Sequence, residues 1–312
     1  MSLSPGDRPY TVRTPRVSAA LKLHRRRERD KAGRFLAEGP QAVREALTAG
    51  VVVELFVTGR VPGRIFGENA ASGVGRGDIF GENAASPLEP LDPTGAASPL
   101  EPQDPTGAAS PLEPLDPSGV RVSVVDEQAM QALSETVTPQ GVVAVCERLD
   151  VALGEALAKG PRLVAVLVDI RDPGNAGTIL RTADAAGAGA VIFAGEAVDP
   201  YNGKCVRASA GSLFHVDVVR ERDVDAVLRE LGGMSVLATS GRGENDLFEV
   251  DLGGPTAWLF GGEAHGLPDE VLERAERVRV PLYGMAESLN LASAAAVCLY
   301  ASARAHHSTD PV

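Results

Sequence analysis

Cysteines and aromatic residues are scarce in this sequence. Of its 312 residues, three are cysteines and only 4% are aromatic. Cys146, Cys205 and Cys298 are odd in number and far apart, which fits neither a disulfide framework nor a zinc cluster. We therefore expect reduced core cysteines in a cytoplasmic protein.

Long apolar runs are also missing. The N-terminus is basic and polar, without the apolar segment of a signal peptide, and no apolar run is long enough to span a bilayer. The sequence thus predicts a protein with no membrane partner. Hydrophobic residues still make up 44% of the chain, which is enough for two globular domains with aliphatic cores.

Positive charge is deficient overall but concentrated near the N-terminus. The formal net charge of −12 argues against a nucleic-acid partner, because phosphate contacts need lysine and arginine. From Arg8 to Arg34, however, ten basic residues stand against two acidic ones. We expect a basic arm, with residues 1–21 preceding the first domain. The alternative is a solvated face or a disordered tail.

A proline-rich stretch interrupts the first half of the chain. Residues 64–119 contain two copies of Ile-Phe-Gly-Glu-Asn-Ala-Ala-Ser, and a twelve-residue unit starting at Ala84 recurs from Ala96 and Ala108. This period is too short for a helical solenoid, and the prolines fit neither a helix nor a central strand. We expect a disordered insert.

Residues 22–150, apart from that insert, read as a small α/β domain with no evident catalytic constellation. Hydrophobic patterning and glycine stops predict its elements. They are helices at 40–50 and 127–134, and strands at 51–57, 120–125 and 141–146.

Residues 160–306 alternate more regularly between strands and helices. The continuous apolar run 163–168 is typical of a buried parallel strand. Further strands are predicted at 190–193, 213–218, 235–239, 256–260 and 277–280, with helices at 176–186, 224–231, 268–275 and 289–305. This pattern predicts a parallel α/β domain, in which ligands bind at the carboxyl ends of the strands.

Three segments of this half combine glycine with polar side chains. Residues 172–181 place Asn175 at a helix entrance, where it can act as an N-cap, with Arg181 further along the same helix. Taken alone, Arg181 reads as a surface helix residue.

In the second segment, 258–267, an apolar strand runs into Gly261, Gly262 and Glu263. Glycines there let a ligand approach the backbone, although Glu263 also suits a cap or a salt bridge. In the third, 280–296, Ser288 can cap a helix rich in small residues.

Common nucleotide-binding signatures are absent. There is no P-loop, and Gly187-Ala188-Gly189 lacks the third glycine of a dinucleotide fingerprint, so a Rossmann-type site is disfavoured. His265 has no paired acid or serine that would indicate a catalytic role.

In their order along the chain and in their residues, these segments together resemble the SpoU (TrmH-like) family of RNA 2′-O-ribose methyltransferases, in the SPOUT superfamily. Residues 172–184, 260–267 and 280–290 resemble its three motifs, and the resemblance covers about 163–304. Upstream, residues 35–39 and 138–144 resemble the family's N-terminal substrate-binding domain, whose fold is similar to a ribosomal RNA-binding protein.

The resemblance implies a fold and an activity. The fold is α/β, with a trefoil-knotted parallel-sheet SPOUT domain at 160–306 that forms a homodimer, and a smaller N-terminal α/β RNA-binding domain. The activity is methyl transfer from S-adenosylmethionine to a ribose 2′-hydroxyl without a metal. The separate N-terminal domain favours 23S ribosomal RNA over transfer RNA.

The resemblance also implies site residues. Arg181 would act at the target hydroxyl as a base or as an electrostatic activator. Residues that would orient it or the RNA phosphate are Asn175, Glu263, Ser288 and Asn290. The cofactor would lie against Thr239, Gly261, Gly262, Val280, Leu282 and Leu289.

Two other functions stay open at this point. One is a non-catalytic RNA-binding protein of ribosome assembly, which would need only the basic surface. The other is a SPOUT enzyme that methylates a base nitrogen of transfer RNA.

Overall fold

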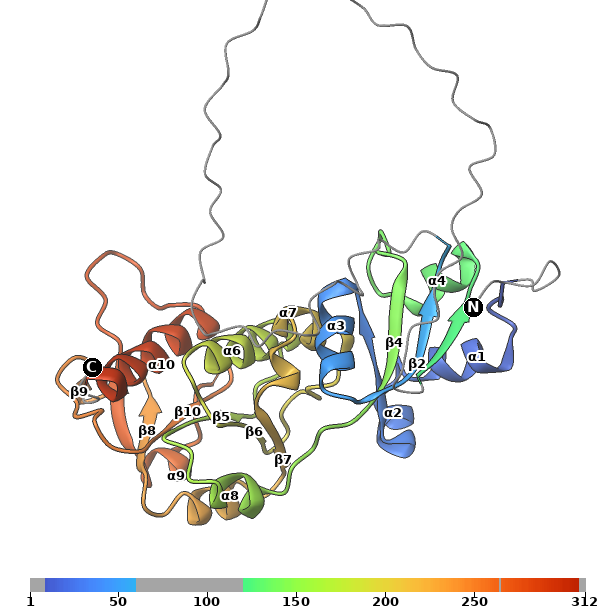
Figure 1. The fold of residues 1–312 in the computed structure, drawn as a ribbon. Helices are drawn as coiled ribbons and strands as arrows, with labels where there is room; N and C mark the ends of the chain where they lie inside the picture. Colours follow the sequence, from blue (N-terminus) through green and yellow to red (C-terminus); the bar gives the residue numbers. More distant parts are fainter. Residues whose placement is uncertain (1–8, 60–119, 264, 309–312) are drawn as a thin grey trace, which may run out of the picture.

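The computed structural model describes residues 9–59, 120–263 and 265–308, which form two α/β units side by side (Figure 1). The predicted insert at 64–119 and the first eight residues of the predicted basic arm lie outside these ranges. Among the described residues, no helix is long and apolar enough to cross a membrane.

The N-terminal unit is built on a four-stranded sheet in the order β1-β4-β2-β3. The central strand β4 runs antiparallel to both β1 and β2, and β3 runs parallel to β2. The strands are β1 Arg34–Glu38, β2 Val52–Val57, β3 Arg121–Val124 and β4 Val142–Glu147. The helices of this unit are α1 Pro15–Lys22, α2 Arg26–Ala32, α3 Pro40–Thr48 and α4 Glu127–Leu133.

The C-terminal unit has a seven-stranded sheet in the order β7-β6-β5-β10-β8-β11-β9, and every neighbouring pair is parallel. Its strands are β5 Leu163–Val168, β6 Ala190–Ala194, β7 Asp217–Glu221, β8 Ser235–Thr239, β9 Asn245–Asp246, β10 Thr256–Phe260 and β11 Glu276–Arg279. All six residues of β5 are buried, as its apolar run predicts for a central strand.

Helices cover both faces of this sheet. Buried residues of α6 (Pro173–Ala185), α7 (Gly203–Ser209) and α10 (Leu291–Ser308) belong to one core cluster. Residues of α5 (Leu153–Ala158), α8 (Val224–Glu230) and α9 (Asp269–Leu272) pack in a second cluster against the other face. The predicted parallel α/β architecture is confirmed. The knot stays a prediction.

Several predicted boundaries were wrong. The predicted strand 213–218 begins instead at Asp217, because Ser212–Phe214 forms a 3₁₀ turn after Ala210 and Gly211, both of which have positive φ. The predicted helix 268–275 is a single turn, α9. Sequence patterning also missed α1, α2, α5, α7, β1 and β9.

The described part of the basic segment is folded rather than an extended arm. Val17 and Ala20 of α1 are buried in the core that also holds Met130 and Leu133 of α4. Arg29 of α2 is only 3% exposed. At least this arginine has a structural role instead of contacting RNA.

Arg29 joins the two units through a buried ion pair. Its Nε and Nη2 both lie 2.8 Å from Oδ2 of Asp199, which is also 3% exposed. Nη1 donates to the backbone carbonyls of Leu23 and His24. The guanidinium and the carboxylate therefore satisfy each other where water cannot reach them.

Aromatic rings and a histidine reinforce this contact between the units. Phe35 of β1 packs against Tyr201 and Phe214, with ring centroids 4.7 and 6.1 Å apart. Around His215, Nδ1 lies 2.8 Å from Asp184 of α6 and Nε2 lies 3.3 Å from Glu45 of α3.

The three cysteines are free and buried, as expected. Burial raises the pKa of each thiol, and that of Cys298 rises to about 12. These thiols are therefore unreactive core residues.

The substitution Asp199→Ala should lower the free energy of unfolding by about 3–5 kcal/mol, because it leaves the Arg29 charge buried without a partner. Denaturant unfolding measures this change. The matched control is Arg229→Ala, which removes an ion pair with Asp223 whose side chains are 62% and 58% exposed. It should change stability by less than about 1 kcal/mol. Equal effects of the two substitutions would contradict a structural role for the buried pair.

The contact of His215 should weaken as the pH rises. Burial alone would lower the pKa of His215, but hydrogen bonds to Asp184 and Glu45 raise it above 6.5. Its stabilising contribution is therefore complete below pH 6.5 and is lost as the pH rises through the higher folded-state pKa. The difference in thermal midpoint between wild type and His215→Gln, measured across this range, should be largest at low pH. A difference that does not change with pH would rule out this interpretation.

Candidate functional site

The carboxyl ends of β5, β10, β8 and β11 lie next to one another along one edge of the parallel sheet. Thr239 ends β8, Gly261 and Gly262 follow β10, and Val280 follows β11. The structure thus brings together four residues that, by the resemblance, would lie around a cofactor. Such an edge is where parallel α/β sheets bind ligands.

A tight turn after β10 forms the centre of this edge. The amide of Gly266 donates to the carbonyl of Gly262 at 2.8 Å. A Cβ added to Gly261 would lie 2.3 Å from the carbonyl carbon of Gly266 and 2.4 Å from the amide nitrogen of Leu267. Only glycine fits there, because the chain folds back against its own backbone.

The hydroxyl of Thr239 links two neighbouring strand ends. Its Oγ1 donates to the carbonyl of Leu259 in β10 at 3.1 Å. A Cβ on Gly262 would lie 3.3 Å from the carbonyl oxygen of Asp169, the residue after β5. The ends of β5, β8 and β10 are therefore held in close contact.

Two helices begin at this edge, and a pair of asparagines connects them. Nδ2 of Asn290, before α10, lies 3.3 Å from Oδ1 of Asn175, in the first turn of α6. Backbone amides at helix N-termini carry partial positive charge and attract anions. The N-terminus of α10, which has the neutral cap Asn290, therefore offers partial positive charge to a carboxylate or a phosphate, whereas that of α6 already holds the carboxylate of Asp172.

The caps of these helices differ from the predicted ones. α6 is capped by Asp172, whose Oδ1 accepts from the amide of Asn175, so Asn175 is not the cap. α10 is capped by Asn290, whose Oδ1 accepts from Ala292 and Ser293. The predicted cap Ser288 lies before the helix and is exposed, since α10 begins only at Leu291.

Asp172 and Lys204 belong to this arrangement and were missed as site residues. Nζ of Lys204 in α7 lies 2.8 Å from Oδ2 of Asp172. This hydrogen bond, followed by that from the amide of Asn175, lowers the pKa of Asp172. The sequence could have indicated Asp172 as a helix cap, because an aspartate directly before a proline is typical of a helix start. Nothing in the sequence marks Lys204.

Arg181, Glu263 and Ser288 are exposed, and none of their side chains has a hydrogen bond or ion pair with another described residue. Arg181 follows Asn175 by six residues of α6, roughly 9 Å along the helix axis. Its guanidinium is therefore available to a ligand. The structure does not bring these three side chains into contact with one another.

The segment between β11 and α10 exposes apolar side chains. Leu282 and Leu289, both predicted cofactor contacts, are 42% and 40% exposed, and Tyr283 and Met285 between them are 88% and 102% exposed. Exposed apolar side chains concentrated in one segment are typical of a surface that binds another molecule.

Among the described residues, no group of three or more histidine, cysteine, aspartate or glutamate side chains could hold a metal ion. The predicted site offers glycine backbone, helix N-termini and a free guanidinium instead. These groups suit an organic ligand with carboxylate or phosphate groups.

Three family models match the chain. The model of the SpoU rRNA methylase family matches residues 162–300. An MRM3-like substrate binding domain matches residues 14–72, and an RNA 2′-O ribose methyltransferase substrate binding domain matches residues 115–152.

Named relatives extend the similarity along the chain. It is 32% identical over 296 residues to the 23S rRNA (guanosine(2553)-2′-O)-methyltransferase RlmP of Bacillus subtilis, covering 93% of this chain and 96% of that protein. It is 35% identical to RlmB of Ralstonia nicotianae, a 23S rRNA (guanosine-2′-O-)-methyltransferase, covering 59% of this chain and 77% of the relative.

Solved structures share the same fold. An AdoMet-bound rRNA methyltransferase from Sinorhizobium meliloti has a TM-score of 0.72 and 27% identity, covering 95% of this chain and 97% of its own. The SpoU methyltransferase AviRb from Streptomyces viridochromogenes, in complex with AdoMet, has a TM-score of 0.69 and 26% identity, covering 95% and 100%.

Gly261→Ala should weaken binding of S-adenosylmethionine at least about tenfold, because the new Cβ displaces the turn at Gly266. Isothermal titration calorimetry measures the affinity. Gly254→Ala is the matched control, since it lies before the same strand and its Cβ would meet nothing within 4 Å. Unchanged affinity in a folded Gly261→Ala variant would remove this turn from the cofactor site.

Proposed function

The chain belongs to the SpoU rRNA methylase family, and on that premise we propose that it transfers a methyl group from S-adenosylmethionine to a ribose 2′-hydroxyl of 23S ribosomal RNA. The observation that carries the proposal is the 32% identity to a 23S rRNA guanosine 2′-O-methyltransferase, of which the chain covers 96%. Residues 22–150 are assigned to RNA binding and 160–306 to methyl transfer.

The sheet edge fits the cofactor. The turn at Gly261 and Gly262 leaves the backbone open to a close ligand, and Thr239 and Val280 flank it on neighbouring strands. Leu282 and Leu289 offer apolar surface on the segment that follows. When bound, the cofactor supplies an electrophilic methyl group on a sulfonium.

Arg181 is the residue assigned to the target hydroxyl. As the ribose oxygen takes the methyl group from the sulfonium, the 2′-hydroxyl proton passes to solvent, to which this site is open, and the positive charge of the guanidinium stabilises the negative charge that develops on the oxygen. Its exposure and its lack of a partner among the described residues leave it available for this role. Positioning of the two reactants supplies much of the remaining rate.

The other polar residues serve to orient the RNA. Asn175 and Asn290 hold the two helix N-termini together through their 3.3 Å contact, and the N-terminus of α10 offers partial positive charge to a phosphate. Glu263, in the loop after β10, and Ser288, just before α10, are both exposed, and they are assigned to contacts with a ribose hydroxyl and with a phosphate, respectively.

A homodimer is part of the proposal. Leu282, Tyr283, Met285 and Leu289 expose apolar surface beside the site, and Phe248 and Tyr300 are 63% and 52% exposed. A second copy that covered these side chains would remove them from water.

A cytoplasmic location is also part of the proposal. Buried, unpaired cysteines are consistent with a reducing cytoplasm.

Arg181→Ala should slow methyl transfer about 10²–10³-fold, the usual cost of losing one group that stabilises developing negative charge. Single-turnover transfer of labelled methyl from S-adenosylmethionine to unmodified 23S RNA measures this, with digestion of the product to nucleosides. Arg181→Lys keeps the positive charge but lacks the planar guanidinium with its several N–H donors, so it should retain part of the rate.

The fractionated RNA identifies the substrate in the same experiment. A labelled 2′-O-methylnucleoside confined to large-subunit RNA supports the proposal. Label on a base of transfer RNA would replace it with a different methyltransferase activity. Absence of both transfer and cofactor binding would leave a non-catalytic RNA-binding protein.

A further inference from the structure

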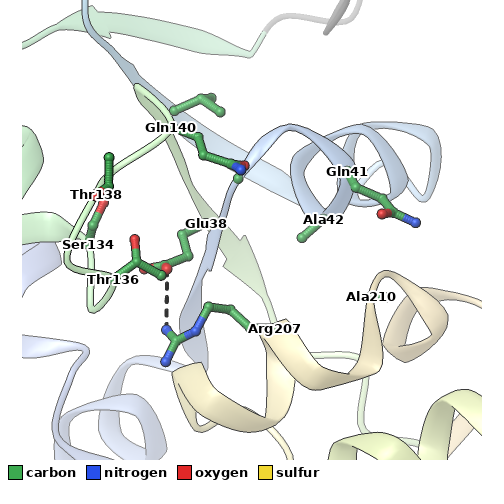
Figure 2. Close-up of a pocket in the computed structure, with 11 residues that line it drawn as sticks. Glu38, Gln41, Ala42, Ser134, Thr136, Thr138, Gln140, Arg207 and Ala210 are labelled. Atoms are coloured by element: carbon green, nitrogen blue, oxygen red, sulfur yellow. Dashed lines mark ion pairs between the residues drawn. The ribbon is translucent and has the colours of Figure 1, made fainter.

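A cavity of about 220 Å³ lies between the two units, outside the methyl-transfer site (Figure 2). The N-terminal unit contributes the end of β1, the first turn of α3 and the loop 134–140, and the C-terminal unit contributes Arg207 and Ala210. Both upstream segments that resemble a substrate-binding domain, 35–39 and 138–144, reach this cavity.

The cavity wall carries hydrogen-bonding groups that are not used within the protein. The side chains of Gln41, Thr136, Thr138 and Gln140 line it, and none of them has a hydrogen bond with another described residue. Figure 2 shows Thr138 and Gln140 on the loop facing α3. These amides and hydroxyls can both donate and accept.

Gly39 keeps this space open. Its φ is +90°, and a Cβ there would lie 2.9 Å from Oε1 of Gln140. The buried side chains of Ala42 and Val142 add an apolar surface. The cavity therefore combines apolar contact with several hydrogen-bonding groups, which is the character of a site for a small planar polar group.

At the base of the cavity, two carboxylates share one guanidinium. Nη1 of Arg207 lies 3.3 Å from Oε1 of Glu38 and 3.1 Å from Oε2 of Glu135. A hydrogen bond from His24 lowers the pKa of Glu135 to about 2, against the opposing effect of burial and with further help from Arg207. Positive charge is not in surplus, so a neutral group suits this cavity better than a phosphate.

One carboxylate oxygen here lacks a hydrogen bond. Oε2 of Glu38 accepts from the amide of Glu135 at 2.7 Å, but the buried Oε1 accepts no hydrogen bond. This oxygen lies 3.3 Å from Nη1 of Arg207 and has almost no exposed surface, so Glu38 belongs to the charged base of the cavity and is not a ligand contact.

We propose that this cavity binds an unpaired nucleobase of the RNA substrate, with Thr138 and Gln140 hydrogen-bonding to the edge of the base. Sequence-specific RNA recognition commonly uses unpaired bases held by their hydrogen-bonding edges. The proposal rests on the proposed function for the presence of RNA. It adds a specificity site that is separate from the reacting ribose.

Helix α7 connects this cavity to the methyl-transfer site. Arg207, near its C-terminal end, lines the cavity, and Lys204, near its N-terminal end, binds Asp172 at the start of α6. The seven residues of α7 span roughly 10 Å. The base bound in the cavity and the target nucleotide would therefore belong to the same folded region of the RNA.

The double substitution Thr138→Ala with Gln140→Ala removes two recognition groups from an exposed loop. The probe is the 23S RNA fragment that wild type binds most tightly without cofactor, so its choice does not depend on methylation. We expect the dissociation constant to rise about 5- to 50-fold, as for two lost neutral hydrogen bonds. The affinity for S-adenosylmethionine should not change.

The matched control is Val137→Ala. Val137 lies between Thr136 and Thr138, is 93% exposed and does not line the cavity. Its variant should bind the fragment as wild type does. Thermal unfolding of both variants shows that the loop changes leave the fold intact.

A series of fragments that each lack one unpaired base identifies the ligand. At one position, loss of the base should weaken wild-type binding about as much as the double substitution does. Loss of the same base should cause little additional weakening in the double variant, which already lacks the groups that contact it. Additive losses at every position, or wild-type affinity in the double variant, would overturn the proposal.

These outcomes separate the two proposals. If wild type methylates RNA normally and the double variant binds the fragment as tightly as wild type, the base-binding role of the cavity is rejected and the proposed function stands. Failure of wild type to methylate any RNA rejects the function. The binding and missing-base measurements still decide whether the cavity holds a base.

Discussion

Parallel pairing of β5, β10, β8 and β11 is the constraint on which the candidate site depends. Because the four strands run the same way, segments that are more than a hundred residues apart in sequence end at one edge. The close turn at Gly261 and the asparagine contact between α6 and α10 then bring backbone and helix N-termini together. No single segment could form such a site alone.

A second requirement is that the N-terminal unit is held firmly against the C-terminal one. The buried Arg29–Asp199 pair and the packing of Phe35 on Tyr201 supply this contact. A buried ion pair contributes little net stability over an apolar pair, but its loss is costly, so it favours one docking geometry. With the units docked in this way, the cavity beside Glu38 keeps a constant position relative to Arg181.

These contacts explain part of the uneven charge distribution along the chain. Part of the basic N-terminal segment neutralises acids of its own chain, as Arg29 does with Asp199. The net charge of −12 includes acids of the repeat-rich stretch 64–119 as well as those of the folded units. The proposed recognition of RNA accordingly rests on particular residues, among them Arg181, Thr138 and Gln140, and not on a generally positive surface.

The sequence by itself determined the α/β class, the parallel sheet and the motif segments, because apolar runs and glycine positions report local burial and backbone freedom. It placed Thr239, Gly261, Gly262 and Val280 at strand ends, where the structure has them. Only tertiary structure decided the caps Asp172 and Asn290, the pairing of Lys204 with Asp172, and the burial of Arg29. The cavity at Glu38 and Arg207 also required it. Such features depend on which side chains meet across long sequence separations, and local pattern carries no information about that.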